Sequence, residues 1–129
     1  MTESRTDVDL GERLVAAIEA GDVEAVADVY ADDVVIWHNT DQTEQSKAEN
    51  LAVLGWLVRK TVSRSYREIR RSETERGFVQ QHVLHLEFSD GRSADLPACL
   101  VVEVTDGHIT RLDEYLDNVG VMAAFGRPG

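Results

Sequence analysis

The chain of 129 residues, with a formal net charge of -11, has about the length of one domain, which is enough to bury most of its apolar surface. The acidic excess argues against nucleic-acid or anionic-membrane binding, because either partner needs a basic contact surface. One cysteine, Cys99, cannot form an internal disulfide, and the N-terminal residues lack the apolar core of a signal peptide. No apolar run approaches the roughly 20 residues that cross a bilayer, so we expect a soluble, cytoplasmic protein.

Three helices and a short strand are predicted for the first half of the chain, after a flexible N-terminus of residues 1–7. Apolar residues recur at helical spacing until Gly21 ends the first helix: Leu10, Leu14, Ala17 and Ile18. Asp22 caps a shorter second helix, and the β-branched run 34–38 is predicted as a strand. Ser46 and Glu49 match a capping box, so a third helix begins there and reaches about residue 61.

The second half is predicted to be four strands in a meander. Asp90-Gly91 and Asp106-Gly107 are typical of hairpin turns. The predicted strands cover residues 64–73, 78–88, 94–104 and 108–117, and a helical turn follows at 119–125. We therefore expect one α+β domain at residues 8–125, with a tail at 126–129.

The last predicted strand carries a carboxylate on the face that should be buried. At a period of two, Glu114 shares a face with Thr110, Leu112 and Leu116, whereas Arg111, Asp113, Tyr115 and Asp117 share the other. A carboxylate among leucines costs several kcal/mol unless it is hydrogen-bonded, paired or protonated, and function is the usual reason to keep one there. A slip of one residue would exchange the faces and turn Tyr115 and Asp117 inward instead.

Two pairs of motifs resemble a known family. They are EAGDVEA at residues 19–25 with YADDV at 30–34, and DGHIT at 106–110 with EYLD at 114–117. They are similar to the nuclear transport factor 2-like superfamily in its SnoaL-like branch, which also includes ketosteroid isomerases and limonene-epoxide hydrolases. The resemblance spans nearly the whole chain. It implies a cone-shaped α+β barrel in which a curved, mainly antiparallel sheet wraps around three helices and encloses an apolar pocket. The expected pocket residues are Leu14, Ile18, Ile36, Val83, Leu100, Leu112 and Leu116.

The resemblance also assigns positions for polar groups. The isomerase base, or the water-positioning amide of the epoxide hydrolases, corresponds to His38, and the carboxylate of the hydrolases' last strand corresponds to Glu114. The Arg-x-Asp pair of the epoxide hydrolases falls at Val83 and His85, so the arginine is missing.

The isomerase acid falls at Leu100, or at Cys99 if the hairpins slip by one residue, and neither is a carboxylic acid. The sequence therefore departs from both of these well-defined chemistries. An ordinary isomerase or epoxide hydrolase is not expected.

The remaining candidates are His38, His85 and Glu114, which the resemblance brings from three strands into one pocket. An imidazole with a carboxylate supplies a base near neutral pH and a group that orients it. We expect a cofactor-free acid-base enzyme (isomerase, cyclase, dehydratase or hydrolase) that acts on a small, mostly apolar molecule. His38 is the expected base, Glu114 orients it or serves as the acid, and His85 binds an oxygen or relays a proton. The alternative is a non-catalytic module that holds an apolar molecule or a protein partner.

Other residues have less specific interpretations. Two histidines and a carboxylate could form a facial metal triad, but no compact ligand motif is present and no metal is expected. Cys99 is expected to turn away from the pocket, while His82 and His108 are expected to face outward or lie in a turn.

Seven of the thirteen basic residues fall between Arg59 and Arg76. This basic belt is either a solvated strand face or a site that captures a carboxylate or phosphate at the pocket mouth. Trp37 and Trp56 lie off the predicted inner faces, so a homodimer is expected.

Overall fold

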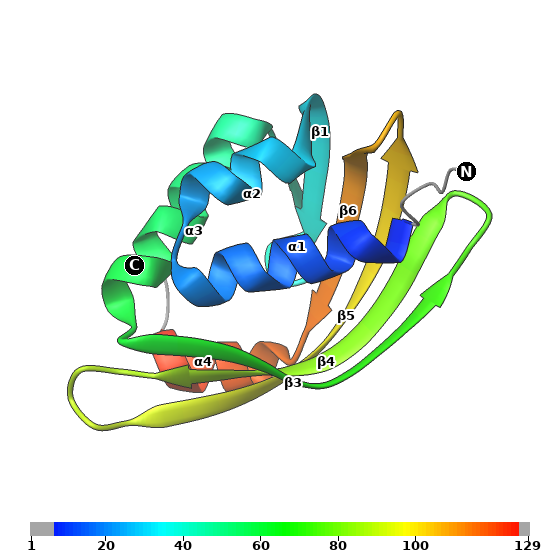
Figure 1. Ribbon diagram of the computed structural model, residues 1–129. Coiled ribbons are helices and arrows are strands. Elements are labelled where there is room, and N and C mark those ends of the chain that lie inside the picture. The colour runs from blue at the N-terminus through cyan, green and yellow to red at the C-terminus, as the bar shows by residue number, and fades with distance from the viewer. Residues whose placement is uncertain (1–6, 127–129) are drawn as a thin grey trace.

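One six-stranded sheet, in the order β2-β1-β6-β5-β4-β3, curls around three of the four helices in the computed structural model (Figure 1). Residues 7–126 are described. The helices are α1 (Asp7–Ala20), α2 (Val23–Val29), α3 (Lys47–Lys60) and α4 (Asn118–Phe125). The strands are β1 (Tyr30–His38), β2 (Thr43–Gln45), β3 (Ser63–Glu73), β4 (Gly77–Glu87), β5 (Ser93–Thr105) and β6 (His108–Leu116). Of the predicted flexible N-terminus, residues 1–6 lie outside the described range, and residue 7 already belongs to α1. Of the predicted tail, residues 127–129 lie outside it as well.

The predicted helix ends are confirmed by their caps. Gly21 has a φ of 72° directly after α1, and the Asp22 side chain accepts a hydrogen bond from the backbone N–H of Ala25 at 3.1 Å. Ser46 and Glu49 form a complete capping box at the start of α3. Among residues 7–126, no helix is long and apolar enough to cross a membrane.

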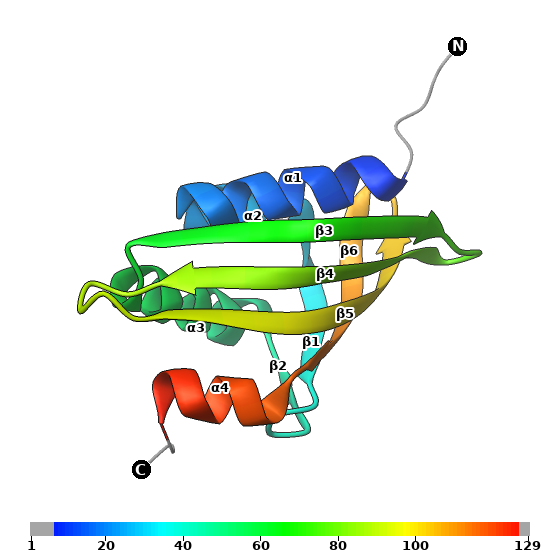
Figure 2. The same cartoon turned by 90° about the horizontal axis from the view of Figure 1, so that it is seen from below.

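The predicted α+β fold is confirmed, and the sheet is curled rather than closed into a barrel. The meander of β3 to β6 is antiparallel, whereas β1 pairs with β6 in parallel. The short strand β2, which was not predicted, pairs with β1 alone. A bulge interrupts β3 between Arg67 and Arg70, and irregularities of this kind bend a strand and increase its twist. Figure 1 shows the curve of β3, β4 and β5, and Figure 2 shows α1 along the β3 edge and α4 at the opposite side.

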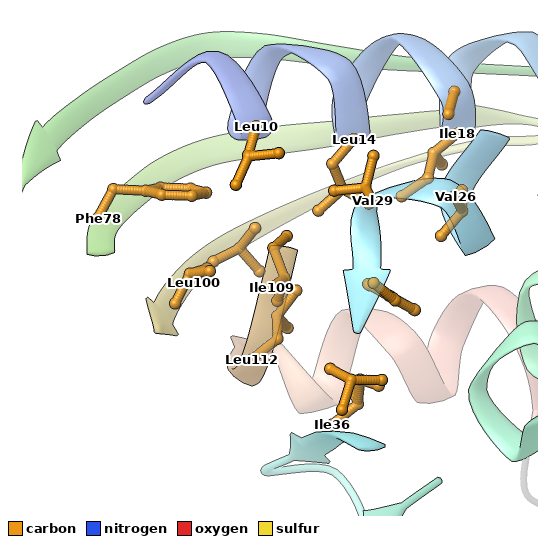
Figure 3. Close-up of a cluster of buried hydrophobic side chains, with 14 residues drawn as sticks. Leu10, Leu14, Ile18, Val26, Val29, Ile36, Phe78, Leu100, Ile109 and Leu112 are labelled. Atoms are coloured by element: carbon orange, nitrogen blue, oxygen red, sulfur yellow. The ribbon is translucent and has the colours of Figure 1, made fainter. Parts of the chain in front are cut away.

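The main core lies between α1 and the inner face of the sheet. Figure 3 shows Leu10, Leu14 and Ile18 of α1 among the side chains that the sheet contributes, which include Phe78, Leu100, Ile109 and Leu112. Ile109 is fully buried, although the predicted inner face of the last strand begins at Thr110. The reason is a register shift between Glu103 and Val104, which pairs Ile109 with Val104 and leaves Thr110 out of the ladder. From Leu112 onward, the predicted alternation holds.

Candidate functional site

A cavity of about 590 Å³ lies between the helices and the inner face of the sheet. Most of its wall is apolar, with leucines from α1, α3 and three of the strands, β4, β5 and β6. Six of the predicted pocket residues line it: Leu14, Ile18, Ile36, Leu100, Leu112 and Leu116. A cavity of this size and lining is typical of sites for small, largely apolar molecules.

His38 and Glu114 meet at this cavity. Nε2 of His38 lies 2.9 Å from Oε1 of Glu114, and the two side chains are 15% and 17% exposed. The parallel pairing of β1 with β6 sets these two residues directly opposite each other. Glu114 therefore points inward, and the alternative register is wrong because Tyr115 and Asp117 are exposed.

The ion pair controls the protonation of the imidazole. Burial opposes the charged form of His38, but the hydrogen bond that His38 donates to Glu114 and the negative charges of Glu114 and Asp41 together outweigh it. The pKa of His38 is therefore raised above its ordinary value of 6.5. A pair of this kind can take up and return a proton close to neutral pH.

Two tyrosines that sequence reasoning did not assign to the site also line the cavity. The Tyr30 hydroxyl donates to Oδ1 of Asn50 at 2.8 Å, and Nδ2 of Asn50 donates to Oε1 of Gln45 at 3.0 Å. Burial, reinforced by the charge of Glu114, raises the pKa of both Tyr30 and Tyr66. Both phenols therefore stay protonated and can act as donors. The sequence did contain a sign that Tyr66 faces inward. Strand β3 is otherwise polar, and its only two apolar residues are Tyr66 and Ile69.

The predictions for Val83 and His85 are wrong, because both lie on the outer face of β4. Nδ1 of His85 is 2.7 Å from Oδ1 of Asp95, and Nε2 is 3.1 Å from Oε2 of Glu87. Counting from Gly77 placed odd-numbered residues inside, whereas the buried residues are Phe78, Gln80, His82, Leu84 and Leu86. His38, His85 and Glu114 therefore do not converge, and they cannot form a facial metal triad.

The same register corrects the prediction for His82, which is 4% exposed and packs its ring against Tyr66. His108 lies exposed at the β5–β6 turn, where Nδ1 is 3.2 Å from the backbone oxygen of Asp106. Cys99 is half-buried and borders a groove on the outer face of the sheet, away from the cavity.

None of the seven residues of the basic belt, all within the described range, lines the wall of the cavity, although Nζ of Lys60 lies 5.9 Å from the ring centroid of Trp56, which does. Arg64 instead binds the end of α1, since its Nε donates to the backbone oxygen of Ile18 at 2.9 Å. Its Nη1 donates to Oγ1 of Thr61 at 2.7 Å. The hypothesis of anion capture at the pocket mouth stays a prediction.

The two tryptophans lie on different surfaces. Trp37 is on the outer face of the sheet and packs edge-to-face against Tyr115, with centroids 5.2 Å apart. Trp56 lines the cavity and contacts Phe125 across the gap between α3 and α4, also at 5.2 Å. Trp56 is thus a residue of the cavity mouth. The sequence did not predict this, because Trp56 lies opposite the apolar stripe of the third helix.

Comparisons with known proteins agree with this geometry. The family model of the SnoaL-like domain matches residues 12–112. A candidate polyketide cyclase from Xanthomonas campestris has a TM-score of 0.80 at 20% identity, over 91% of this chain and 94% of that chain. IdmH, a candidate polyketide cyclase from Streptomyces antibioticus, has a TM-score of 0.80 at 20% identity, over 95% and 100%.

A protein from Catenulispora acidiphila with a ketosteroid isomerase-like fold, in complex with trimethylamine, has a TM-score of 0.80 at 11% identity, over 93% of this chain and 94% of that chain. A comparison with curated proteins finds no match. At these identities, the structural likeness establishes the fold alone.

Proposed function

Because this chain belongs to the SnoaL-like domain family, we propose that it is a cofactor-free enzyme that transfers protons on a small, mostly apolar molecule. The observation that carries the proposal is the 2.9 Å contact between His38 and Glu114 beside an apolar cavity. A base of this kind needs only a carboxylate to orient it and a donor for the oxygen that gains charge. The candidate polyketide cyclases of the same fold support this class of chemistry.

The reaction proposed is removal of a proton from a carbon next to a carbonyl group. His38 takes the proton, Glu114 orients the imidazole and stabilises its cation, and the C–H electron pair moves into an enolate. The enolate oxygen accepts a hydrogen bond from the Tyr66 phenol, which remains protonated. Return of the proton to another carbon gives an isomer, whereas attack of the enolate carbon on a second carbonyl gives an aldol-type ring.

The charges around the cavity support a neutral or cationic substrate. Glu114 and Asp41 line the cavity, and within the described residues no lysine or arginine does. A substrate carboxylate would meet these two like charges, and the one group of the wall that can become cationic, His38, is already paired with Glu114. We therefore propose that the acting group of the substrate is a neutral ketone or aldehyde.

The test is exchange of the hydrogens next to the carbonyl of 2-tetralone, followed by proton NMR in deuterium oxide. We expect the protein to accelerate exchange and His38→Gln to lower the rate by about 10²–10⁴-fold. Glu114→Gln should also lower the rate, and it should move the acidic limb of the pH profile to lower pH, because its loss lowers the pKa of His38. His85→Gln is the matched control, since its imidazole is also bound to carboxylates but lies on the outer face. That variant should exchange 2-tetralone at the wild-type rate.

A binding protein is the second candidate, and the predominance of leucine in the wall supports it. Such a protein would bind 2-tetralone without accelerating exchange, and His38→Gln would leave the affinity unchanged. Measurable binding together with exchange at the uncatalysed rate would exclude the proposed enzyme.

A further inference from the structure

A buried polar chain runs along the inner face of β4 and has no part in the proton transfer proposed above. Nε of Arg71 donates to Oε1 of Gln80 at 2.6 Å, and Nε2 of Gln80 lies 2.9 Å from Nδ1 of His82. Gln80 is 0% and His82 4% exposed. Among the side-chain nitrogens and oxygens of the described residues, Nε2 of His82 is the one that is buried with no hydrogen-bond partner.

The hydrogen bonds from Arg71 to Gln80 and from Gln80 to His82 fix the tautomer of His82. Arg71 can only donate, so the oxygen of the Gln80 amide must face it and the amide NH₂ must face the imidazole. Nδ1 of His82 therefore accepts a hydrogen bond. In the neutral ring, the hydrogen is then on Nε2. Burial lowers the pKa of His82, against the opposing charge of Glu114, so this neutral form is favoured.

The local backbone makes room for this arrangement. A Cβ on Gly11 of α1 would lie 2.7 Å from Nε of Arg71, so a larger residue at this position would displace the guanidinium. Glu12, next to it, places a carboxylate oxygen 3.8 Å from Nη1 of Arg71. Arg71 and Gln80 thus transmit the position of α1 to the His82 ring and fix its orientation. The Nε2–H of that ring remains unpaired. A buried donor without an acceptor is costly, so an occupant for it is expected.

The position of His82 indicates what that occupant is. Its ring lies 4.6 Å, centroid to centroid, from the ring of Tyr66, which lines the cavity. Leu84, the next inward residue on β4, also lines it. Across the sheet, His82 pairs with Ala98, and Ala98 pairs with Leu116 of the cavity wall. His82 itself does not line the cavity: it stands one ring behind the wall, packed against Tyr66, and it also borders the groove near Cys99 on the other side.

We propose that the Nε2–H of His82 donates a hydrogen bond to an oxygen atom of the ligand, which a small rotation of the Tyr66 ring admits. The ligand class is a neutral molecule with a carbonyl or hydroxyl oxygen. This inference rests on the proposed function in one respect, namely that the cavity is the ligand site. It adds a second donor beside the Tyr66 phenol for the same oxygen, and this donor is held rigidly from α1.

The first experiment compares two probes of nearly equal shape, 2-tetralone and its oxygen-free counterpart tetralin. We expect wild-type protein to bind the ketone more tightly than the hydrocarbon. His82→Phe should weaken ketone binding about five- to tenfold, the usual effect of one hydrogen bond, and leave tetralin binding nearly unchanged. His85→Phe is the matched control and should keep the ketone preference, because His85 lies on the same strand but on its outer face. An equal ketone preference in wild type and His82→Phe would overturn the proposal.

The second measurement uses the unaltered protein and does not depend on whether the variant folds. In ¹⁵N-labelled protein, the side-chain N–H of His82 should be observed on Nε2 and should shift on addition of 2-tetralone, but not of tetralin. A hydrogen on Nδ1, or a resonance that the ketone leaves in place, would contradict the proposal. If the wild type prefers the ketone, His82→Phe loses that preference and the wild type does not accelerate exchange, the proposed enzyme is rejected while this donor stands, so the two failures are distinguishable.

Discussion

The ion pair between His38 and Glu114 should stabilise the fold by an amount that a double-mutant cycle can measure. The proteins are the wild type, His38→Gln, Glu114→Gln and the double variant, and the quantity is the coupling in their free energies of unfolding. Hydrogen bonds to charged groups contribute about 1.5–3 kcal/mol. Because the two side chains keep 15% and 17% exposure, water screens part of the interaction, and we expect a coupling of about 1–2 kcal/mol near pH 6.

The expected shift in melting temperature follows from the chain length. At about 2.1 cal/mol/K of unfolding entropy per residue, 129 residues give about 0.27 kcal/mol/K. A coupling of 1–2 kcal/mol then corresponds to about 4–7 °C in Tm. Thermal unfolding followed by circular dichroism resolves a difference of this size.

The coupling should fall as the pH rises, and the sign follows from the raised pKa of His38. The folded state binds the His38 proton more tightly than the unfolded state. The stabilisation is therefore fully present below the unfolded-state pKa of about 6.5 and is lost as the pH rises through the folded-state pKa. His85 has a raised pKa as well, from its hydrogen bonds to Asp95 and Glu87, but it is present in all four proteins and cancels from the cycle.

The assay is the cycle measured at about pH 6 and about pH 9, on either side of the expected transition. A coupling below about 0.5 kcal/mol at the lower pH would show that the pair is not formed in solution. An equal coupling at both values would mean that His38 does not change charge between them, and the reasoning on its pKa would be wrong.

Three further predictions concern the scaffold. Gly77→Ala should lower stability by about 1–3 kcal/mol, because its Cβ would strike a backbone carbonyl of β5. Gly55→Ala within α3 should raise it by about 0.5–1 kcal/mol, because its Cβ would meet only the flexible end of Arg59, at 3.4 Å. Arg64→Met should cost about 1–2 kcal/mol in urea unfolding through loss of the hydrogen bonds at the end of α1, while the exposed Arg67→Met should change stability by less than about 0.5 kcal/mol. We also propose that the outer face of the sheet around the exposed Tyr115 forms a homodimer; light scattering should then give a dimer mass for the wild type and a monomer mass for Tyr115→Glu.

The elements predicted correctly are those whose signals are local. The caps at Asp22 and Ser46 lie within three residues of the backbone groups that they bind, so sequence spacing is enough to identify them. The short strand β2 was missed because it has three residues, two of them exposed, and becomes a strand only by pairing with β1. Hydrophobic periodicity within a segment does not show which distant strand the segment will pair with, so it could not predict β2.

The inward faces of the strands were predictable only where the opposite face is polar. In β6, Leu112 and Leu116 share a face with Glu114, while the other face is mostly charged, so the alternation has one interpretation. In β4, apolar residues stand on both faces, with Val83 outside and Leu84 inside. The inward face of β4 was therefore assigned only by counting residues from Gly77, and this placed Val83 and His85 inside instead of outside. The roles of the two β4 histidines were exchanged as a result.

The polar groups that the two proposals use come from four strands, and this distribution limits how a substrate can be held. His38 and Glu114 belong to the paired strands β1 and β6, while Tyr66 and His82 belong to the paired strands β3 and β4. Strand β5 separates the two pairs, and it contributes apolar side chains such as Leu96 and Leu100 to the wall between them. An α C–H group and its carbonyl oxygen are only two bonds apart, so His38 and Tyr66 can act on one carbonyl group only if both side chains reach over β5 to the same point of the cavity. The apolar remainder of the substrate then packs against the β5 side chains. A ligand that is held with its oxygen on Tyr66 but with its α carbon out of reach of His38 would be bound without being deprotonated.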